Sequence, residues 1–150
     1  PEWQVKIFGV GDGKRELAEL IESLGLENRV ALCGRTEAPF YEMSKASIFV
    51  LSSYYEGFPN VLCEAMYAGD LCIASDCVSG PRELIEQNEN GWLFPVEDKE
   101  TLTRLLEACI MQESQLEQVR DKARNSVKRL YLENNLRLWK DMINEVVRKE

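Results

Sequence analysis

Residues 47–75, SIFVLSSYYEGFPNVLCEAMYAGDLCIAS, decide the fold class of this chain. Apolar runs at 47–52 and 71–75 have the length of β-strands, and residues 59–68 between them have a helical pattern. An uninterrupted apolar run is typical of a strand that is covered on both faces. Two such strands joined through a helix predict neighbouring parallel strands, with the helix packed against their sheet.

The same alternation continues on both sides of this stretch. The further elements that we predict are strands at 5–10, 30–33 and 91–94 and helices at 14–24, 39–45 and 81–86. From about residue 98 no strand pattern remains, and apolar residues recur at helical steps between solvated charges. We therefore predict an α/β fold, a Rossmann-like parallel sheet with helices on both faces, followed by C-terminal helices. Residues 1–150 are taken as one domain, with a helical segment over about 98–150.

Composition excludes several classes of function. The 150 residues contain no histidine, which removes Ser-His-Asp catalysis and histidine metal ligands. A formal net charge of −8 repels nucleic acid. The five cysteines form no C-x-x-C pair, which favours core thiols in a reducing compartment over disulfides or zinc. The longest apolar run has about ten residues, whereas a membrane span needs roughly 20.

The loop after the 47–52 strand carries the strongest candidate site, because ligands of open parallel sheets bind where the strands end. Gly57 allows an unusual backbone angle and the close approach of a ligand. Pro59 suits the first position of a helix. Free N–H groups near Asn60 and Val61 would then form a site suited to phosphate.

Two glutamates accompany this loop. Glu64 falls inside the predicted helix, where its carboxylate can accept hydrogen bonds from a pair of sugar hydroxyls. Glu56 precedes the helix and can face the polar end of a ligand. The structural alternative is that both are solvated surface carboxylates. Glycines at 9, 11 and 13 do not form the dinucleotide fingerprint, because Lys14 takes the place of its last glycine.

At these residues the chain resembles a known family. Glu56 and Glu64, within EGFPNVLCEAMYAG, resemble the E-x7-E signature of retaining GT-B glycosyltransferases of the group-1, or family-4, type. The similarity covers nearly the whole chain in the family's order and spacing, through KIFGVGDG, ASIFVLSS, LCIASD, SGPRELI and NGWLF. The resemblance implies the C-terminal, donor-binding domain of such an enzyme, lacking its first strand.

The resemblance also implies a role for each matching position. Glu56 would be the catalytic residue at the transferred sugar, and Glu64 would hold the ribose hydroxyls of a nucleotide-sugar donor. Arg35 would border the nucleobase, with an ordinary surface arginine as the alternative. The donor-binding residues that the resemblance implies are Glu64, Gly57, Phe58, Pro59, Asn60, Val61 and Arg35.

The function implied for the parent protein is retaining sugar transfer from a UDP- or GDP-sugar to a saccharide or lipid-linked acceptor. The setting would be polysaccharide or glycolipid synthesis in the cytoplasm, with peripheral contact at the inner face of the membrane. No metal or other cofactor is expected, since no Asp-x-Asp triplet is present. The alternative is a GT-B-fold sugar-nucleotide-binding or epimerase-like protein without transferase activity.

The chain departs from the family pattern at its start. Family members begin this half with a strand and loop whose Arg and Lys-Gly grip the donor phosphates, and an acceptor-binding half precedes it. We therefore expect the isolated chain to be inactive. In the family sheet the missing strand lies between the strands at 5–10 and 47–52. We expect these two strands to pair directly, the alternative being that a strand of another molecule fills the gap.

Overall fold

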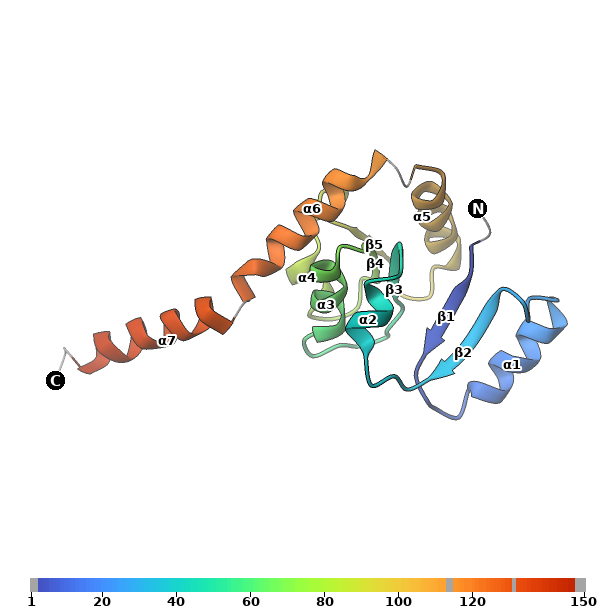
Figure 1. The fold of residues 1–150 in the computed structure, drawn as a ribbon, viewed down its shortest axis with the longest axis horizontal. Helices are drawn as coiled ribbons and strands as arrows, with labels where there is room; N and C mark the ends of the chain where they lie inside the picture. The colour runs from blue at the N-terminus through green and yellow to red at the C-terminus, as the bar shows by residue number, and fades with distance from the viewer. Residues whose placement is uncertain (1–2, 113–114, 131, 148–150) are drawn as a thin grey trace. The chain divides into compact units, whose positions relative to one another are not determined.

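The computed structural model describes residues 3–112, 115–130 and 132–147, and it contains the predicted alternation of strands and helices (Figure 1). The chain divides into two compact units, Pro1–Pro39 and Phe40–Glu150. None of the helices among the described residues is long and apolar enough to cross a membrane.

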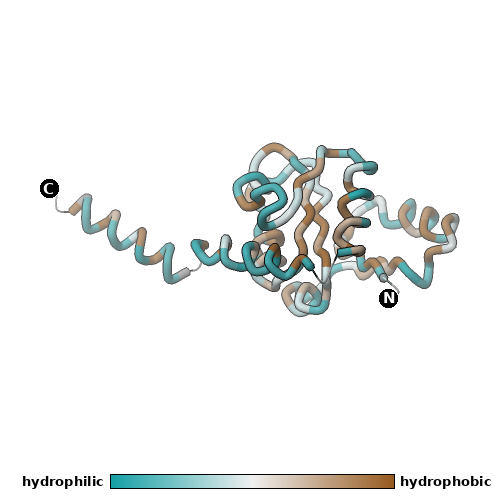
Figure 2. Tube along the Cα trace, turned by 90° about the horizontal axis from the view of Figure 1, so that it is seen from above, coloured by the Kyte–Doolittle hydropathy of each residue, from teal (hydrophilic) through white to brown (hydrophobic). Residues whose placement is uncertain are grey.

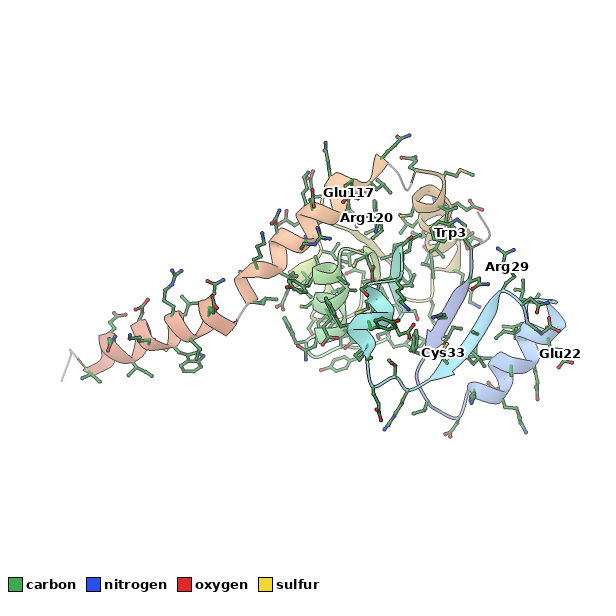
Figure 3. The ribbon with its side chains drawn as sticks, in the orientation of Figure 1. Trp3, Glu22, Arg29, Cys33, Glu117 and Arg120 are labelled. Atoms are coloured by element: carbon green, nitrogen blue, oxygen red, sulfur yellow. The ribbon has the colours of Figure 1, made fainter. Side chains whose placement is uncertain are left out.

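The first unit is a small strand, helix, strand motif. It contains β1 (Val5–Phe8), α1 (Lys14–Ser23) and β2 (Val30–Gly34), and its two strands pair in parallel. The Nε–H of Arg29 donates a hydrogen bond to the carbonyl of Trp3 at 2.7 Å, which ties the entry of β2 to that of β1 (Figure 3). No residue of α1 is buried, so its leucines lie at the surface of this unit.

The second unit is built on three parallel strands in the order β3-β4-β5. Along the chain, helices lie between these strands and after them, and α2 contains the boundary between the two units. The elements are α2 (Pro39–Met43), β3 (Ile48–Leu51), α3 (Asn60–Ala68), β4 (Leu71–Ser75), α4 (Pro81–Leu84), β5 (Trp92–Phe94), α5 (Lys99–Gln112), α6 (Glu117–Ser126), the 3-10 helix η2 (Val127–Leu130) and α7 (Leu132–Val147).

The core of the second unit is organised around its central strand, β4, whose successive side chains point to opposite faces of the sheet. All of β4 is buried, and its residues alternate between two apolar clusters. Cys72 and Ala74 pack with residues of α3, α4 and α6, whereas Leu71 and Ile73 pack with residues of α5. Hydrophobic strands therefore lie between two layers of helices (Figure 2). This confirms the predicted α/β class with helices on both faces.

Each unit pairs its own strands. Strand β1 pairs with β2 in the first unit, and β3 pairs with β4 in the second. The expected pairing of β1 with β3 would join the two units, and it stays a prediction. The apolar pattern specifies which face of a strand is buried, but pairing uses main-chain groups that every residue carries. Strand β3 contacts both layers of helices, since Phe49 and Leu51 belong to one apolar cluster and Ile48 to the other, although Val50 is 37% exposed. That a strand of another molecule completes the sheet stays a prediction.

Candidate functional site

Three loops meet at the carboxyl ends of the strands in the second unit. They follow β3, β4 and β5, and hydrogen bonds join the first loop to each of the others. Ser75 Oγ, at the end of β4, donates to the carbonyl of Ser53 at 2.5 Å. The hydroxyl of Tyr54 donates to a carboxylate oxygen of Glu97 at 3.2 Å, and this bond raises the pKa of Tyr54. The loop after β3 is therefore held on both sides at the edge where a ligand is expected.

The start of α3 differs from the prediction in two respects. The helix begins at Asn60, and Pro59 is its buried N-cap residue. Pro59 has φ −81° and ψ 76°, and the Asn60 N–H donates to the Phe58 carbonyl at 2.9 Å, which is an inverse γ-turn. The expectation of a free Asn60 amide is therefore wrong, because the turn uses it. The Val61 N–H donates to no protein acceptor in the part of the chain that the structure describes.

Gly57 lacks one of the two features predicted for it. Its φ is not positive, so the unusual backbone angle expected at this glycine is not used. A Cβ built on Gly57 would meet no atom within 4 Å, which means that the main chain here faces open space. The neighbouring Phe58 is 45% exposed. The absence of a side chain leaves room for a ligand beside the loop.

The two glutamates of the E-x7-E pattern occupy different environments. Glu56 is half-buried, and its Oε1 accepts a hydrogen bond from Ser53 Oγ at 2.6 Å. The carbonyl of Glu56 accepts a second bond, from Ser79 Oγ at 2.7 Å. Glu64 is exposed on α3, and its carboxylate has no hydrogen-bond or ion-pair partner among the described residues. The loop glutamate is thus fixed in place, while the helix glutamate is free to bind a ligand.

Arg35 belongs to the first unit, not to the one that carries the two glutamates. It follows Gly34, which ends β2 with φ 70°, and its side chain is exposed. The second unit by itself therefore brings together Glu56, residues 57–61 and Glu64.

Three thiols of the second unit are not suited to nucleophilic chemistry. Burial raises the pKa of Cys63, which lies beside Glu64. Burial also raises the pKa of Cys109 to about 11 and that of Cys72 well above its ordinary value. A thiol is reactive as the thiolate, so these cysteines are inert core residues. Within the described ranges, no group of three Cys, Asp or Glu side chains could hold a metal ion.

An open hollow of about 550 Å³ lies beside the second and third loops, away from the two glutamates. Its lining includes Ile85, Leu93 and Phe94 together with the ion pair of Arg82 and Asp76. The guanidinium of Arg82 donates two hydrogen bonds to the Asp76 carboxylate, one of them at 2.5 Å. Because these charges neutralise each other, the hollow offers a ligand no net charge. Asp76 is therefore the ion-pair partner of Arg82 in this hollow.

The residues that support Glu56 are not predicted by any sequence pattern. They are Ser53, Ser75 and Ser79, each of which donates a hydrogen bond to residues 53–56. The loops at 52–60 and 75–80 were recognisable as loops at the carboxyl ends of strands. A serine gives no sequence signal that distinguishes a solvated loop hydroxyl from one that is bonded to a neighbouring loop.

Comparison with known proteins identifies the family. The sequence pattern of the family described as "Glycosyl transferases group 1" matches residues 1–126. An exopolysaccharide phosphotransferase of Streptomyces coelicolor is 34% identical over 148 residues, which are 98% of this chain and 16% of that protein. A lipopolysaccharide 1,6-galactosyltransferase of Salmonella typhimurium is 39% identical over 97 residues, which cover 62% of this chain and 27% of that protein.

Solved structures agree with the fold. The crystal structure of a mutant of S. aureus TarM in complex with fondaparinux, alpha-GlcNAc-glycerol and UDP has a TM-score of 0.84 and 27% sequence identity to this chain. The superposition covers 94% of this chain and 29% of that one. The chain thus spans well under half the length of the relatives that it matches.

Proposed function

The chain belongs to the group 1 glycosyl transferases, and from this premise we propose that it binds the nucleotide-sugar donor of a retaining glycosyltransferase. The proposed reaction moves a sugar from a nucleoside diphosphate to a saccharide or lipid-linked acceptor. One observation supports the proposal most strongly. Glu64 presents an exposed carboxylate, unpaired among the described residues, about one helical turn beyond the unbonded Val61 N–H at the start of α3.

These two groups suit different parts of a nucleoside diphosphate. The Val61 N–H lies at the positive end of the α3 dipole, where phosphate oxygens bind favourably. A carboxylate at Glu64 repels phosphate but accepts hydrogen bonds from the two hydroxyls of a ribose. We therefore assign the ribose to Glu64 and the diphosphate to the main chain of residues 58–61. Arg35 is proposed to border the nucleobase.

Glu56 is proposed to contact the transferred sugar. Departure of the diphosphate leaves positive charge at the anomeric carbon, and a carboxylate that is already oriented stabilises that charge without reorganising. The hydrogen bond from Ser53 fixes such an orientation before any ligand binds. Main-chain N–H groups would meet the negative charge on the leaving diphosphate. No metal ion takes part in the proposed site, and retention of anomeric configuration is carried over from the family resemblance.

The acceptor is proposed to bind outside this chain, which spans 16% and 27% of the two curated relatives described above. Transfer requires both substrates to be held in reacting geometry, so the 150-residue chain alone should bind the donor without transferring its sugar. The names of the relatives point to cell-surface polysaccharide or glycolipid synthesis, and we propose a cytoplasmic site for it.

Titration calorimetry on this chain tests the assignment of Glu64. UDP, GDP and ADP are compared first, since UDP is the nucleotide bound in the TarM structure. Glu64→Ala should weaken binding of the preferred nucleotide by about 10- to 150-fold, the equivalent of roughly 1.5–3 kcal/mol for hydrogen bonds to a charged group. The matched control is Glu107→Ala, which removes an exposed glutamate of α5 and should leave the affinity unchanged. Equal affinity of Glu64→Ala and the wild type would refute the ribose assignment.

A further inference from the structure

Three serine hydroxyls hold the segment that ends at Glu56. Ser75 Oγ donates to the Ser53 carbonyl at 2.5 Å, and Ser53 Oγ donates to Glu56 Oε1 at 2.6 Å. Ser79 Oγ donates to the Glu56 carbonyl at 2.7 Å. We call Ser53, Ser75 and Ser79 the serine clamp. Two of its members, Ser75 and Ser79, come from β4 and the loop after it and hold the backbone carbonyls of Ser53 and Glu56. The Glu56 carboxylate itself is held by Ser53, from the same loop.

Ser79 makes its hydrogen bond from an unfavourable backbone conformation. Its φ is 64°, in the left-handed region that residues with a Cβ rarely adopt. Glycine would adopt this φ without strain, but it has no hydroxyl to donate. Strained residues persist where the surrounding structure holds them, and they cluster at functional sites. The strain at Ser79 is accompanied by one visible gain, which is the hydrogen bond to Glu56.

The residues on either side of Ser79 also contact the Glu56 loop. Val78 forms a parallel bridge with Tyr55. A Cβ on Gly80 would lie 2.6 Å from Cδ of Pro59 and 3.5 Å from the Gly57 carbonyl, so the two loops meet too closely for any side chain there. Residues 78–80 therefore lie along residues 55–59, and Ser79 supplies the hydrogen bond at the centre of this contact.

We propose that Ser79 is a positioning residue that orients Glu56 toward the sugar of the donor. This inference rests on the proposed function, in which Glu56 contacts that sugar. Ser79 fixes the main chain of Glu56, and Ser53 occupies Oε1. Glu56 Oε2 accepts no hydrogen bond among the described residues, so this oxygen is the one presented to a sugar. A carboxylate that acts on a sugar must be held within a fraction of an ångström of its productive position. A residue on a loop reaches that precision only when neighbouring residues hold it by hydrogen bonds.

Ser79→Gly and Ser79→Ala separate the hydrogen bond from the backbone strain. Both remove the hydroxyl, but only glycine relieves the positive φ. Asn88→Gly is the matched control, since Asn88 has φ 65° in the turn before β5. Amide hydrogen exchange on the free chain should be about tenfold faster over residues 55–58 in both Ser79 variants, as expected for local opening, and unchanged in the control. Wild-type protection of these residues in Ser79→Gly would overturn the proposal.

Ligand binding tests the role in positioning. The readout is the affinity for UDP-glucose, UDP-galactose and UDP-N-acetylglucosamine relative to that for UDP, measured by calorimetry. Both Ser79 variants should bind UDP with the affinity of the wild type. Their preference for the best nucleotide sugar over UDP should be about fivefold smaller, which corresponds to the loss of one hydrogen bond. Ser53→Ala should act in the same direction, and Ser53→Thr, which keeps a hydroxyl, should restore the preference.

The outcomes distinguish the two proposals. If the wild-type chain binds a nucleotide sugar more tightly than UDP, and the Ser79 variants keep this preference, only the positioning role of Ser79 is overturned. A wild-type chain that shows no such preference for any of these donors would overturn the assignment of Glu56 to the sugar, and the positioning role with it. A loss of preference in Ser79→Gly with unchanged UDP affinity supports both.

Discussion

Glu56 and Glu64 carry the same functional group, and their surroundings give them different tasks. The carboxylate of Glu56 already accepts one hydrogen bond, from Ser53, and is half-buried. The carboxylate of Glu64 is exposed, with no protein partner in the described part of the chain. The E-x7-E spacing predicts both positions, but it does not predict that one is preorganised and the other is solvated.

Glu56→Gln removes the charge and keeps an oxygen that can accept the Ser53 hydrogen bond. We expect its UDP affinity to stay within about twofold of the wild type, because the glutamate is assigned to the sugar and not to the nucleotide. The preference for a nucleotide sugar over UDP should fall by about fivefold or more, since a hydrogen bond to a charged acceptor is lost. Calorimetry of both ligands checks this, with Glu83→Gln on α4 as the control. An equal loss for UDP and the nucleotide sugar would contradict the placement of Glu56 at the sugar.

Asp70 is the residue whose burial no sequence pattern predicted. It is 2% exposed at the start of β4, and its Oδ2 has no hydrogen-bond partner within the described ranges. Burial raises the pKa of Asp70 to about 7, although the Arg120 guanidinium opposes this shift. The Cys72 thiol, which donates to the Asp70 carbonyl at 3.5 Å, is the other titratable group that interacts with it. The folded chain therefore keeps Asp70 protonated over a range in which the unfolded chain ionises it.

This difference makes stability fall as the pH rises. An unfolded Asp ionises near pH 4, whereas Asp70 in the folded chain does so near pH 7. Between these values the folded state binds the additional proton, so the free energy of unfolding decreases with rising pH. Asp70→Asn should flatten this slope and stabilise the fold at pH 8 by roughly 1–3 kcal/mol, the cost of a buried unsatisfied group. Urea unfolding at pH 5 and pH 8 measures it, with the exposed Asp12→Asn as the control. A slope that persists in Asp70→Asn would assign the effect to other groups.

At the scale of elements, α6 is linked to the sheet through one arginine. Arg120 projects from α6, as does Glu117 one turn before it (Figure 3). Its Nη1 donates to the carbonyl of Ser47, before β3, at 3.0 Å and to that of Gly69, after α3, at 2.9 Å. The side chain is only 13% exposed, so these hydrogen bonds are shielded from water. A helix from the charged carboxyl-terminal third therefore fixes the far end of the helix that carries Glu64.

Arg120→Met keeps much of the aliphatic volume and removes the donors. We expect the free energy of unfolding to fall by about 2–3 kcal/mol, because two part-buried carbonyls lose a charged donor. The decrease should be larger at pH 8 than at pH 5, since Asp70 then ionises without its opposing charge. Urea unfolding compares this variant with Arg104→Met, an exposed arginine of α5 that should change stability by less than about 0.5 kcal/mol. A change in Arg120→Met no larger than in this control would show that α6 does not depend on the link.

The sequence predicted elements best where burial is complete. The bounds of β4 are those that the apolar run predicts, and every residue of this strand is buried. The prediction for β1 is too long by two residues. The Gly9 N–H still donates to the Gly34 carbonyl at 2.8 Å, but the strand ladder with β2 ends at Phe8. The helix α3 was predicted to begin at Pro59 but begins at Asn60. A proline suits the first position of a helix and also the γ-turn that precedes this one. Periodicity reports burial, so the ends of elements, where burial fades, are the parts that it predicts least well.

At the scale of the whole molecule, the sequence predicted the class and the family, but not which strands form the edges within each unit. The described strands form a pair, β1-β2, in the first unit and a triplet, β3-β4-β5, in the second. Side-chain patterns distinguish the faces of a sheet, whereas its edges are made of main-chain groups that no pattern distinguishes. The candidate site, too, could be predicted only in part. Both glutamates could be predicted because the motif is local, and the serine clamp could not because it joins separate loops.

Within the described residues of the second unit, β3 has β4 on one side and no strand on its other side. Its residues are apolar, and Val50 is 37% exposed. Long or apolar edges with unpaired N–H and C=O groups pair with other chains unless a charge or a proline prevents it. We therefore expect the chain to associate through this edge, with a stability that depends on protein concentration.

Val50→Lys tests the edge directly. A lysine on the exposed side of an edge strand opposes pairing by charge, and it costs little where the side chain is already partly solvated. The wild type should show a mass that rises with concentration in sedimentation equilibrium, and Val50→Lys should shift this rise to about tenfold higher concentration, the equivalent of roughly 1.4 kcal/mol. Val78→Lys, in a loop where the valine is 77% exposed, controls for the added charge. A wild type that stays monomeric throughout, or a Val78→Lys that dissociates equally, would show that the open edge of β3 is not the site of association.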